Sequence, residues 1–329
     1  MINTRLALSV AIAAGLIASV TLAPTANAAG KFPTKPIRVI VPTGPGGSTD
    51  VTSRLVASVI HQYLGQPMII QLKGGAGGSI GMAATMAEKA DGYTLVFGTG
   101  NHTSIVPHVR NVPYDSLNDF IPVFKVNNDP YMIVALPNRY KTFQDLIKDM
   151  KANPGKRSYA SNGLYGNGHS MILKIELDKG VKFKHVPFKG GGPSMRAMLG
   201  GHVDTSGGLF STAGTLGRYR AGKVVILGIA AEKRDPLAPD VPTFRELGVD
   251  FVYQLWRGFL AKKGTPQDRI DIIVDALYKT MKDKTFKRMM KAVGSPPNPL
   301  HGKAYKDMIL AEHKQFGKIF EQVGVKKKK

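Results

Sequence analysis

The sequence predicts an α/β fold in which largely parallel sheets are flanked by helices. Short runs of β-branched residues alternate with stretches in which apolar residues recur at helical spacing. Three glycine-rich stretches, 44–50, 74–79 and 98–101, stand where a strand should give way to a helix. A chain of 329 residues is long enough for two domains, each with its own core.

Residues 37–97 carry this alternation most clearly. Strands are predicted at Ile37–Val41, Met68–Leu72 and Thr94–Phe97. A helix between the first two strands is expected to begin at Ser48 or Thr49, either of which can cap it, and to end at Gly65. A shorter helix over 80–90 connects the second strand to the third.

The remaining chain predicts a second domain and a return to the first. Apolar runs at Ile121–Val126 and Tyr131–Leu136 are split by Asn127-Asn128-Asp129-Pro130, where the chain is expected to cross. Beyond it, the sequence predicts helices at 142–152, 170–178 and 193–199, strands at 159–160, 185–188 and 224–230, and a Gly/Asn loop at 162–169. Long helices are expected at 266–293 and 303–322, after a return near 248–256. Residues 29–128 and 248–325 are thus assigned to domain 1, and 129–247 to domain 2.

The N-terminal 28 residues have the pattern of a signal peptide. Arg5 precedes the apolar stretch Leu6–Ala23, and Ala26-Asn27-Ala28 places small residues where a signal peptidase cleaves, near Ala28/Ala29. An uncleaved membrane anchor is the alternative. The chain has no cysteine, so an exported form has no disulfide and no lipid on an N-terminal cysteine.

The chain is strongly basic, with a formal net charge of +22. Setting aside Arg5 and the four lysines of 326–329 leaves +17, and this field attracts anions. Nucleic-acid binding is a weaker alternative, because the cations are scattered and no nucleic-acid-binding signature is present. The lysine run itself is expected to be a solvated, disordered tail.

Glycine-rich loops that lead into helices favour a site for a small anion. Such loops leave backbone N–H groups unpaired, and the helix dipole adds positive charge at the same place. The usual nucleotide-binding signatures are absent. No carboxylate pair or Cys/His cluster suggests a metal, and His102 and His108 have no helical metal-pair spacing. Neither a cofactor nor a metal is expected.

A secreted serine hydrolase remains an alternative because Gly77-Gly78-Ser79-Ile80-Gly81 matches the Gly-x-Ser-x-Gly nucleophile elbow. Asp204 and His301 would be the partners of Ser79, although nothing in the sequence places them together. The simpler interpretation is that Ser79 caps a helix or donates to an anion. His169, after Gly168, either faces a ligand or is a solvated or capping residue, and Trp256 is expected in the core or the cleft wall.

Nine segments, taken in order, resemble one family. The chain is similar to the Bug family, the periplasmic solute-binding proteins of tripartite tricarboxylate transporters, from about Phe32 to Gly324. The matching segments are Lys35–Arg38 with Gly44–Asp50, Gly75–Gly81, Asp91–Leu95, Pro113–Phe120, Ala152–Lys156, His185–Gly190, Leu199–Asp204, Pro239–Thr243 and Gly264–Pro266.

This resemblance implies a type II periplasmic-binding-protein fold, in which two α/β domains close on a small carboxylate. It implies a monomeric, non-enzymatic periplasmic protein that delivers its ligand to the membrane subunits of the transporter; a role as a ligand sensor for a membrane receptor stays open. The expected first wall of the site consists of Gly46, Gly47, Ser48, Thr49, Gly78, Ser79, Thr99 and Asn101. The expected second wall consists of Ser161, Asn162, Gly168, His169, Phe188, Lys189, Gly190, Gly208 and Leu209.

Two departures from the family pattern bear on the ligand. Phe188 stands where many relatives have tyrosine, and Gly207-Gly208-Leu209 stands where many have Phe-Asp-Asn. One hydroxyl and one carboxylate are therefore missing. The resulting hypothesis is that the ligand lacks an ammonium group and has a larger or more apolar distal half.

Overall fold

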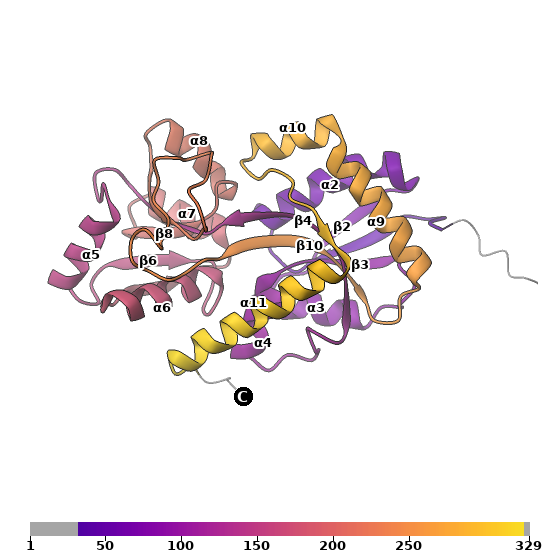
Figure 1. Cartoon of the computed structure of the whole chain (residues 1–329), viewed down its shortest axis with the longest axis horizontal. Coiled ribbons are helices and arrows are strands. Elements are labelled where there is room, and N and C mark those ends of the chain that lie inside the picture. The colour runs from indigo at the N-terminus through magenta and orange to yellow at the C-terminus, as the bar shows by residue number, and fades with distance from the viewer. Residues whose placement is uncertain (1–31, 326–329) are drawn as a thin grey trace, which may run out of the picture.

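Two sheets organise residues 32–325, the part of the chain that this computed structural model describes (Figure 1). The predicted signal peptide, its cleavage near Ala28/Ala29 and the predicted tail at 326–329 lie outside the described residues. Each sheet has its own helices and its own core, so the predicted α/β class with two domains is confirmed.

The first sheet has six strands in the order β11-β4-β10-β3-β1-β2. The strands β1, β2 and β3 run parallel, and β10 lies antiparallel between β3 and β4. Their bounds are β1 Ile37–Val41, β2 Met68–Leu72, β3 Thr94–Thr99, β4 Phe120–Pro130, β10 Gln254–Lys262 and β11 Leu300–His301. The parallel part therefore brings the carboxyl ends of β1, β2 and β3 to one edge, where α/β proteins bind ligands.

Helices cover both faces of the first sheet. One core packs α2 and α9 on residues such as Val39 and Phe97, and a second core places Trp256 and Tyr305 on the other face. The helices are α2 Ser48–Leu64, α3 Ser79–Met86, α4 Val106–Val109, α9 Gln267–Lys282, α10 Lys284–Ala292 and α11 Gly302–Gln322. Trp256 is 1% exposed, as expected for a core residue.

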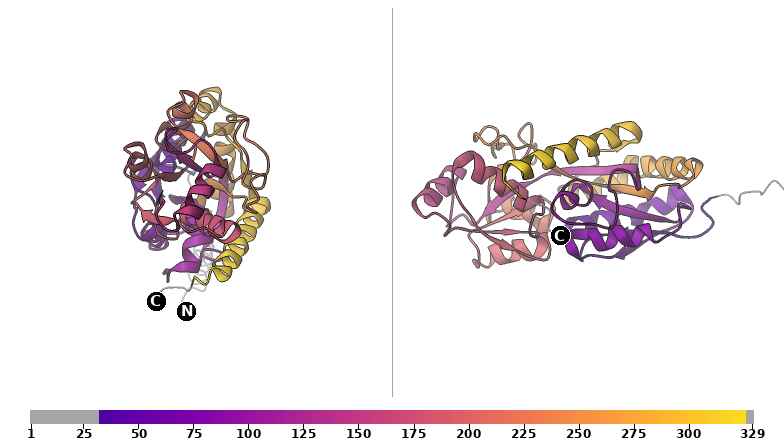
Figure 2. Two further views of the ribbon diagram at one scale, coloured as in Figure 1. Left: turned by 90° about the vertical axis from the view of Figure 1, so that its left-hand side faces the viewer. Right: turned by 90° about the horizontal axis from the view of Figure 1, so that it is seen from below.

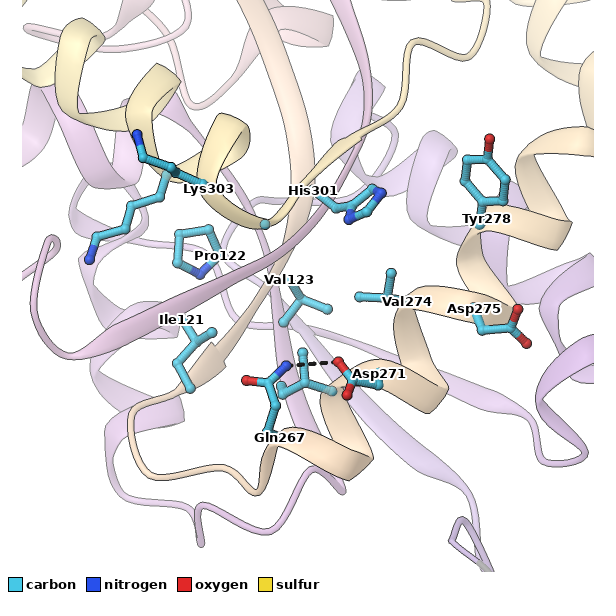
Figure 3. A pocket seen from close by; sticks show the side chains of 13 residues that line it. Ile121, Pro122, Val123, Gln267, Asp271, Val274, Asp275, Tyr278, His301 and Lys303 are labelled. Carbon is cyan, nitrogen blue, oxygen red and sulfur yellow. Dashed lines mark hydrogen bonds between the residues drawn. The ribbon is translucent and has the colours of Figure 1, made fainter.

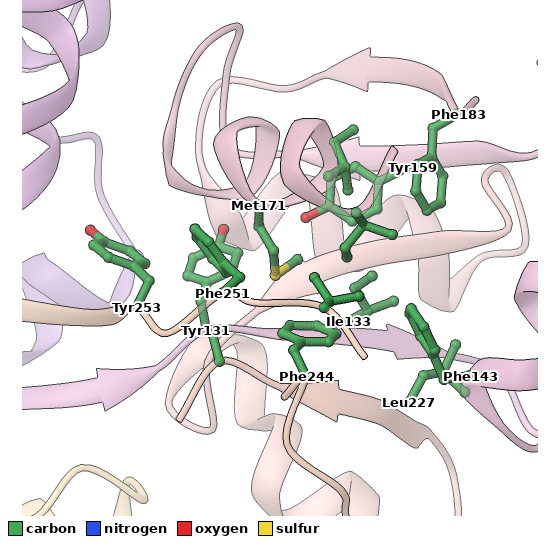
Figure 4. Close-up of a cluster of buried hydrophobic side chains, with 14 of the residues drawn as sticks. Tyr131, Ile133, Phe143, Tyr159, Met171, Phe183, Leu227, Phe244, Phe251 and Tyr253 are labelled. Atoms are coloured by element: carbon green, nitrogen blue, oxygen red, sulfur yellow. The ribbon is translucent and has the colours of Figure 1, made fainter. Parts of the chain in front are cut away.

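The second sheet has five strands in the order β7-β6-β8-β5-β9. Its parallel strands are β6, β7 and β8, and β5 lies antiparallel between β8 and β9. The elements are β5 Met132–Ala135, β6 Ser158–Ser161, β7 Lys184–Pro187, β8 Thr205–Gly208, β9 Val225–Ile229, α5 Phe143–Ala152, α6 Asn167–Lys179, α7 Gly191–Leu199 and α8 Thr215–Arg220. A core rich in aromatic residues, with Tyr131, Tyr159 and Phe244, supports it (Figure 4).

The domains are joined by two neighbouring segments and by one long helix. The chain leaves through β4 into β5 and returns into β10, where Gln254 pairs with Pro130. Helix α11 begins on the first domain, but its Phe316, Ile319 and Phe320 belong to the aromatic core of the second (Figures 1 and 2). This helix therefore packs on both domains.

Several sequence-based boundaries were wrong. The strand over 121–126 does not end at Val126, because Asn127–Pro130 continue β4 by pairing with β10; the chain then passes to the second sheet after Pro130. The helix expected at 266–293 ends at Lys282, and Asp283 begins a new helix by capping it. The helix at 80–90 ends at Met86, and β8 was not foreseen because its Thr-Ser-Gly-Gly sequence has no apolar signal.

Candidate functional site

Four helices begin at the carboxyl ends of parallel strands without a side-chain cap. Each has a glycine at the N-cap position: Gly47 for α2, Gly78 for α3, Gly166 for α6 and Gly190 for α7. By contrast, Thr142 caps α5 and Asp283 caps α10 with their side chains. The first-turn N–H groups of α2, α3 and α7 therefore keep no side-chain acceptor, as an anion site requires, whereas in α6 the Gly168 N–H donates to the Asn162 side chain at 3.3 Å.

The loop after β1 is shaped by Asp50 rather than by a serine or threonine cap. The carboxylate of Asp50 accepts a hydrogen bond from the Gly46 N–H at 2.9 Å and pairs with Arg54 at 2.7 Å. Gly46 has a φ of +74°, a conformation that glycine adopts without strain. The prediction that Ser48 or Thr49 caps α2 was wrong: Gly47 holds that position, Ser48 is the first helical residue, and Thr49 is buried.

His102 holds the three loops of the first wall together. Its Nδ1 accepts a hydrogen bond from the Thr99 N–H at 3.1 Å, and its ring also hydrogen-bonds the Pro42 carbonyl. The ring packs so closely on Gly78 that a Cβ there would lie 2.3 Å from it. Burial lowers the pKa of His102 to about 4, so the imidazole is neutral at pH 7.

Asn101 adds a direct link between two of these loops. Its Nδ2 donates to the Gly77 carbonyl at 2.8 Å, and its N–H donates to the Thr99 hydroxyl at 3.3 Å. The structure thus brings Gly78, Thr99 and Asn101 together beside His102. The sequence analysis missed His102 because its role depends on contacts with residues far away in the chain.

Ser79 does not cap α3, since Gly78 holds that position. The Ser79 hydroxyl donates to the Ala76 carbonyl at 3.0 Å. The two proposed catalytic partners lie in different domains. Asp204 accepts hydrogen bonds from Ser158 beside the second sheet, and His301 stacks on Phe124 in the first.

The second wall is built around a hydrogen-bonded serine and histidine. The Ser161 hydroxyl, at the end of β6, lies 2.6 Å from Nε2 of His185, and the Ser161 carbonyl accepts from the Phe188 N–H at 2.9 Å. The Asn162 side-chain oxygen accepts from the Gly168 N–H at 3.3 Å. These contacts gather Ser161, Asn162, Gly168 and Phe188 in one network.

His169 lies in the first turn of α6, since this helix begins at Asn167 rather than after the loop. Its ring stacks on that of His185 with 3.9 Å between centroids, and its Nδ1 accepts from the Tyr165 N–H at 2.9 Å. Burial lowers the pKa of His169 to about 3 and that of His185 to about 4. His169 is 8% exposed, so the solvated alternative was wrong, and contact with a ligand stays a prediction.

The two walls meet at Gly46 and Gly192. A Cβ on Gly192, in the first turn of α7, would lie 3.8 Å from the Gly46 carbonyl oxygen and 3.4 Å from Nη1 of Arg196. Lys189 is exposed immediately before the N-cap glycine of the same helix. Arg196 was missed from the sequence, although its spacing of four residues from Gly192 puts both on one face of α7.

Gly208 and Leu209 lie at the end of β8 and stay predictions as ligand contacts. Leu209 is 3% exposed and belongs to the aromatic core, and a Cβ on Gly208 would lie 2.7 Å from Cε of Met195. At Gly207, a Cβ would lie 2.1 Å from the Tyr159 hydroxyl. The Tyr159 hydroxyl therefore occupies the space that a side chain at position 207 would need.

A separate cavity of about 580 Å³ lies on the first domain. Figure 3 shows Gln267 and Asp271 on one side of it and His301 and Lys303 on the other, with Val123 between them. All its lining residues come from β4, α9, β11 and α11, so it is distinct from the junction at Gly46 and Gly192. Residues 32–325 contain no group of acidic and histidine side chains that could hold a metal, and no helix long and apolar enough to cross a bilayer.

Comparisons with known proteins agree with this fold. The profile of the tripartite tricarboxylate transporter family receptors, TctC, matches residues 52–325. Protein BugT of Bordetella pertussis is 32% identical over 307 residues, which cover 91% of this chain and 93% of BugT. The structure of periplasmic binding protein BugD superimposes with a TM-score of 0.83 at 29% identity, covering 90% of this chain and all of BugD. An R. palustris protein in a structure with adipate gives 0.82 at 25% identity, with 90% and 100% covered.

Two α/β domains that meet along uncapped helix ends define the class of periplasmic solute-binding proteins with a type II fold. Within this class, the chain belongs to the tripartite tricarboxylate transporter receptor family, TctC, which includes the Bug proteins.

Proposed function

We propose that this protein captures a small carboxylate between its two domains and delivers it to the membrane subunits of a tripartite tricarboxylate-type transporter. The observation that carries the proposal is the approach of the Gly46 loop to Gly192, because each belongs to a helix start with unpaired N–H groups. A carboxylate bound there gains contacts with both domains at once, and such contacts favour the closed arrangement.

The charges beside this junction support an anionic ligand. Lys189 immediately precedes the N-cap glycine of α7, and Arg196, in the last turn of this helix, has its Nη1 3.4 Å from where a Cβ on Gly192 would lie. Within residues 32–325 neither cation forms an ion pair. The departures at Phe188 and at Gly207 to Leu209 support a ligand without an ammonium group. The adipate bound by the R. palustris relative has this chemistry, with carboxylates at both ends of an aliphatic chain.

Export to the periplasm fits this function. The family is periplasmic, and the N-terminal sequence has the signal-peptide pattern with a cleavage site near Ala28/Ala29. A monomer suffices, since both walls come from one chain. The domain division proposed from the sequence, with 129–247 as domain 2, is compatible with the sheet that holds β5 to β9.

A thermal-shift screen of the mature protein tests the proposal. The panel contains mono-, di- and tricarboxylates, aromatic acids, acidic amino acids and the uncharged diamide of adipate. A carboxylate at about 100 times its dissociation constant adds about 2.7 kcal/mol of stability. We expect a selective shift with one carboxylate class and none with the diamide, whereas equal shifts with acid and diamide contradict the proposal.

Arg196→Gln gives a second measurement on the same site. This change should weaken binding of the best acid about tenfold, because it removes one full charge beside the ligand. Lys148→Gln is the matched control, since Lys148 is an exposed cation on α5, away from the helix starts of the site. Equal effects of the two changes would mean that the acid binds elsewhere.

A further inference from the structure

A cationic stripe runs along the exposed face of α10. Lys284, Lys287, Arg288 and Lys291 are spaced at i, i+3, i+4 and i+7, so they share one face of this helix. All four side chains are exposed, and in the described part of the chain none of them forms an ion pair. We call these four residues the α10 stripe.

The opposite face of α10 fixes the stripe rigidly on the first domain. Phe286 and Met290 are fully buried in the core that also contains α2 and α9. Asp283 is the one carboxylate between residues 276 and 300. Its side chain accepts from the Phe286 N–H at 2.8 Å and from the Tyr63 hydroxyl at 2.9 Å, at the start of the helix. No acidic residue on α10 offsets the repulsion among the four cations.

We propose that the α10 stripe docks the protein on an anionic phospholipid surface. Protein interfaces are depleted of lysine and are anchored by buried aromatic or aliphatic residues. The stripe has three lysines and one arginine, and the apolar residues of α10 face the core instead. Such a face suits the diffuse charge of lipid headgroups, where each cation near the surface strengthens binding about fivefold.

The position of α10 determines which side of the protein would face the bilayer. The helix leads into Gly294, where a Cβ would lie 2.9 Å from Cδ2 of Leu216 and 3.0 Å from Cβ of Phe210, both in the second domain. Figure 1 likewise shows α10 beside the junction, across from α8. Adsorption through the stripe therefore holds this side of the domain junction at the bilayer. The idea that this orientation favours transfer to membrane subunits rests on the proposed function. The lipid contact itself does not depend on the proposed function.

Vesicle sedimentation of the mature chain tests the proposal. Vesicles contain about one part phosphatidylglycerol to two parts phosphatidylcholine, or phosphatidylcholine alone, in about 0.1 M NaCl. The stripe variant carries Lys284→Gln, Lys287→Gln, Arg288→Gln and Lys291→Gln. The matched control carries Lys148→Gln, Lys151→Gln, Lys314→Gln and Lys318→Gln, which are exposed, loses the same charge and, like the stripe variant, keeps 326–329. Glutamine preserves helix propensity, and equal melting temperatures verify folding.

We expect the native protein to bind the anionic vesicles and not the neutral ones, with binding weakened by added salt. The stripe variant should bind about 600-fold more weakly, and the control should lose less than about fivefold. Equal losses in both variants would overturn the proposal in favour of a diffuse effect of net charge. Unchanged binding of the stripe variant would assign adsorption to another surface. If the native protein ignores the vesicles but binds polyglutamate, the partner is an acidic protein instead.

Discussion

Arg257 donates to Asp129 at 2.7 Å across the two strands that join the domains, and both side chains are buried, at 0% and 2% exposure. Ser295 also donates to both carboxylate oxygens of Asp129, at 2.6 and 2.7 Å. Arg257 faces Asn127 of β4 on one side and Thr99 of β3 on the other. The strand junction between the domains therefore contains a buried charge pair beside the candidate site.

Breaking this pair should destabilise the protein strongly. Asp129→Asn leaves the buried Arg257 charge without its counter-charge, and we expect a loss of about 3–5 kcal/mol in urea unfolding. Asp275→Asn is the control, because Asp275 pairs with Lys279 on the surface, and it should cost less than about 1 kcal/mol. Similar losses in the two variants would contradict a special role for the buried pair.

A side chain at Gly192 should prevent the approach of the two walls. Gly192→Leu places methyl groups between α7 and the Gly46 carbonyl, so we expect the carboxylate-induced thermal shift to disappear while the ligand-free melting temperature stays close to that of the native protein. Gly217→Leu is the matched control, because Gly217 also lies in a helix and a Cβ there meets no atom within 4 Å. A full ligand shift in Gly192→Leu would place the ligand away from this junction.

The contact between Gly78 and His102 should tolerate no Cβ. Gly78→Ala combines a φ of +95° with a Cβ only 2.3 Å from the imidazole, and we expect it to cost about 3 kcal/mol or more of unfolding free energy. Gly65→Ala separates the two effects, because its φ is +76° with no atom within 4 Å of the Cβ. It should cost about 1 kcal/mol. A smaller loss at position 78 than at position 65 would show that the loops move apart easily.

Stability should fall as the pH is lowered from about 6.5 to 4. Burial holds the pKa of His102 near 4, so in this window the unfolded chain binds a proton that the folded chain does not. His102 alone then removes about 2–3 kcal/mol, and His169 and His185 act with the same sign. Urea unfolding at several pH values measures the slope; a stability that stays level or rises toward pH 4 contradicts the buried neutral state.

Glu312 should act with the opposite sign at higher pH. Burial raises the pKa of this carboxyl, which accepts from the Trp256 indole at 2.6 Å, to about 8. Between pH 4.5 and 8 the folded chain keeps a proton that the unfolded chain releases, so stability falls as the pH rises. Glu312→Gln should therefore gain stability at pH 8 relative to pH 5, by about 3–4 kcal/mol. An equal effect at both pH values would mean that Glu312 is ionised when folded.

The alternation of strands and helices could be predicted because each element carries its own local signal. The run Ile37–Val41 and the helix that ends at Gly65 are examples, since β-branched residues and a left-handed glycine act within a few positions. β8 could not be predicted, because Thr-Ser-Gly-Gly forms a strand only through its pairing with β5 and β6.

The sequence indicated which loops form the candidate site, but not the side-chain contacts within it. Glycine-rich strand ends indicated the starts of α2, α3 and α7, but not the contacts that hold them. His102 and His185 act across 24 residues of the chain, through the contacts of His102 with Gly78 and of His185 with Ser161. Such contacts depend on the folded arrangement and leave no pattern in a single sequence.

Closure on a carboxylate is the central claim, and a distance between the two domains tests it most directly. Because the chain has no native cysteine, spin labels attach only to the two cysteines introduced by Gln62→Cys on α2 and Lys148→Cys on α5. Both positions are exposed. Double electron–electron resonance then compares the ligand-free protein with the protein saturated by the best acid of the thermal-shift screen. The account predicts a broad distribution of label-to-label distances without ligand and a single narrow one with ligand. The narrow distribution should correspond to the arrangement in which Gly46 lies next to Gly192. An unchanged distribution at full saturation would contradict it.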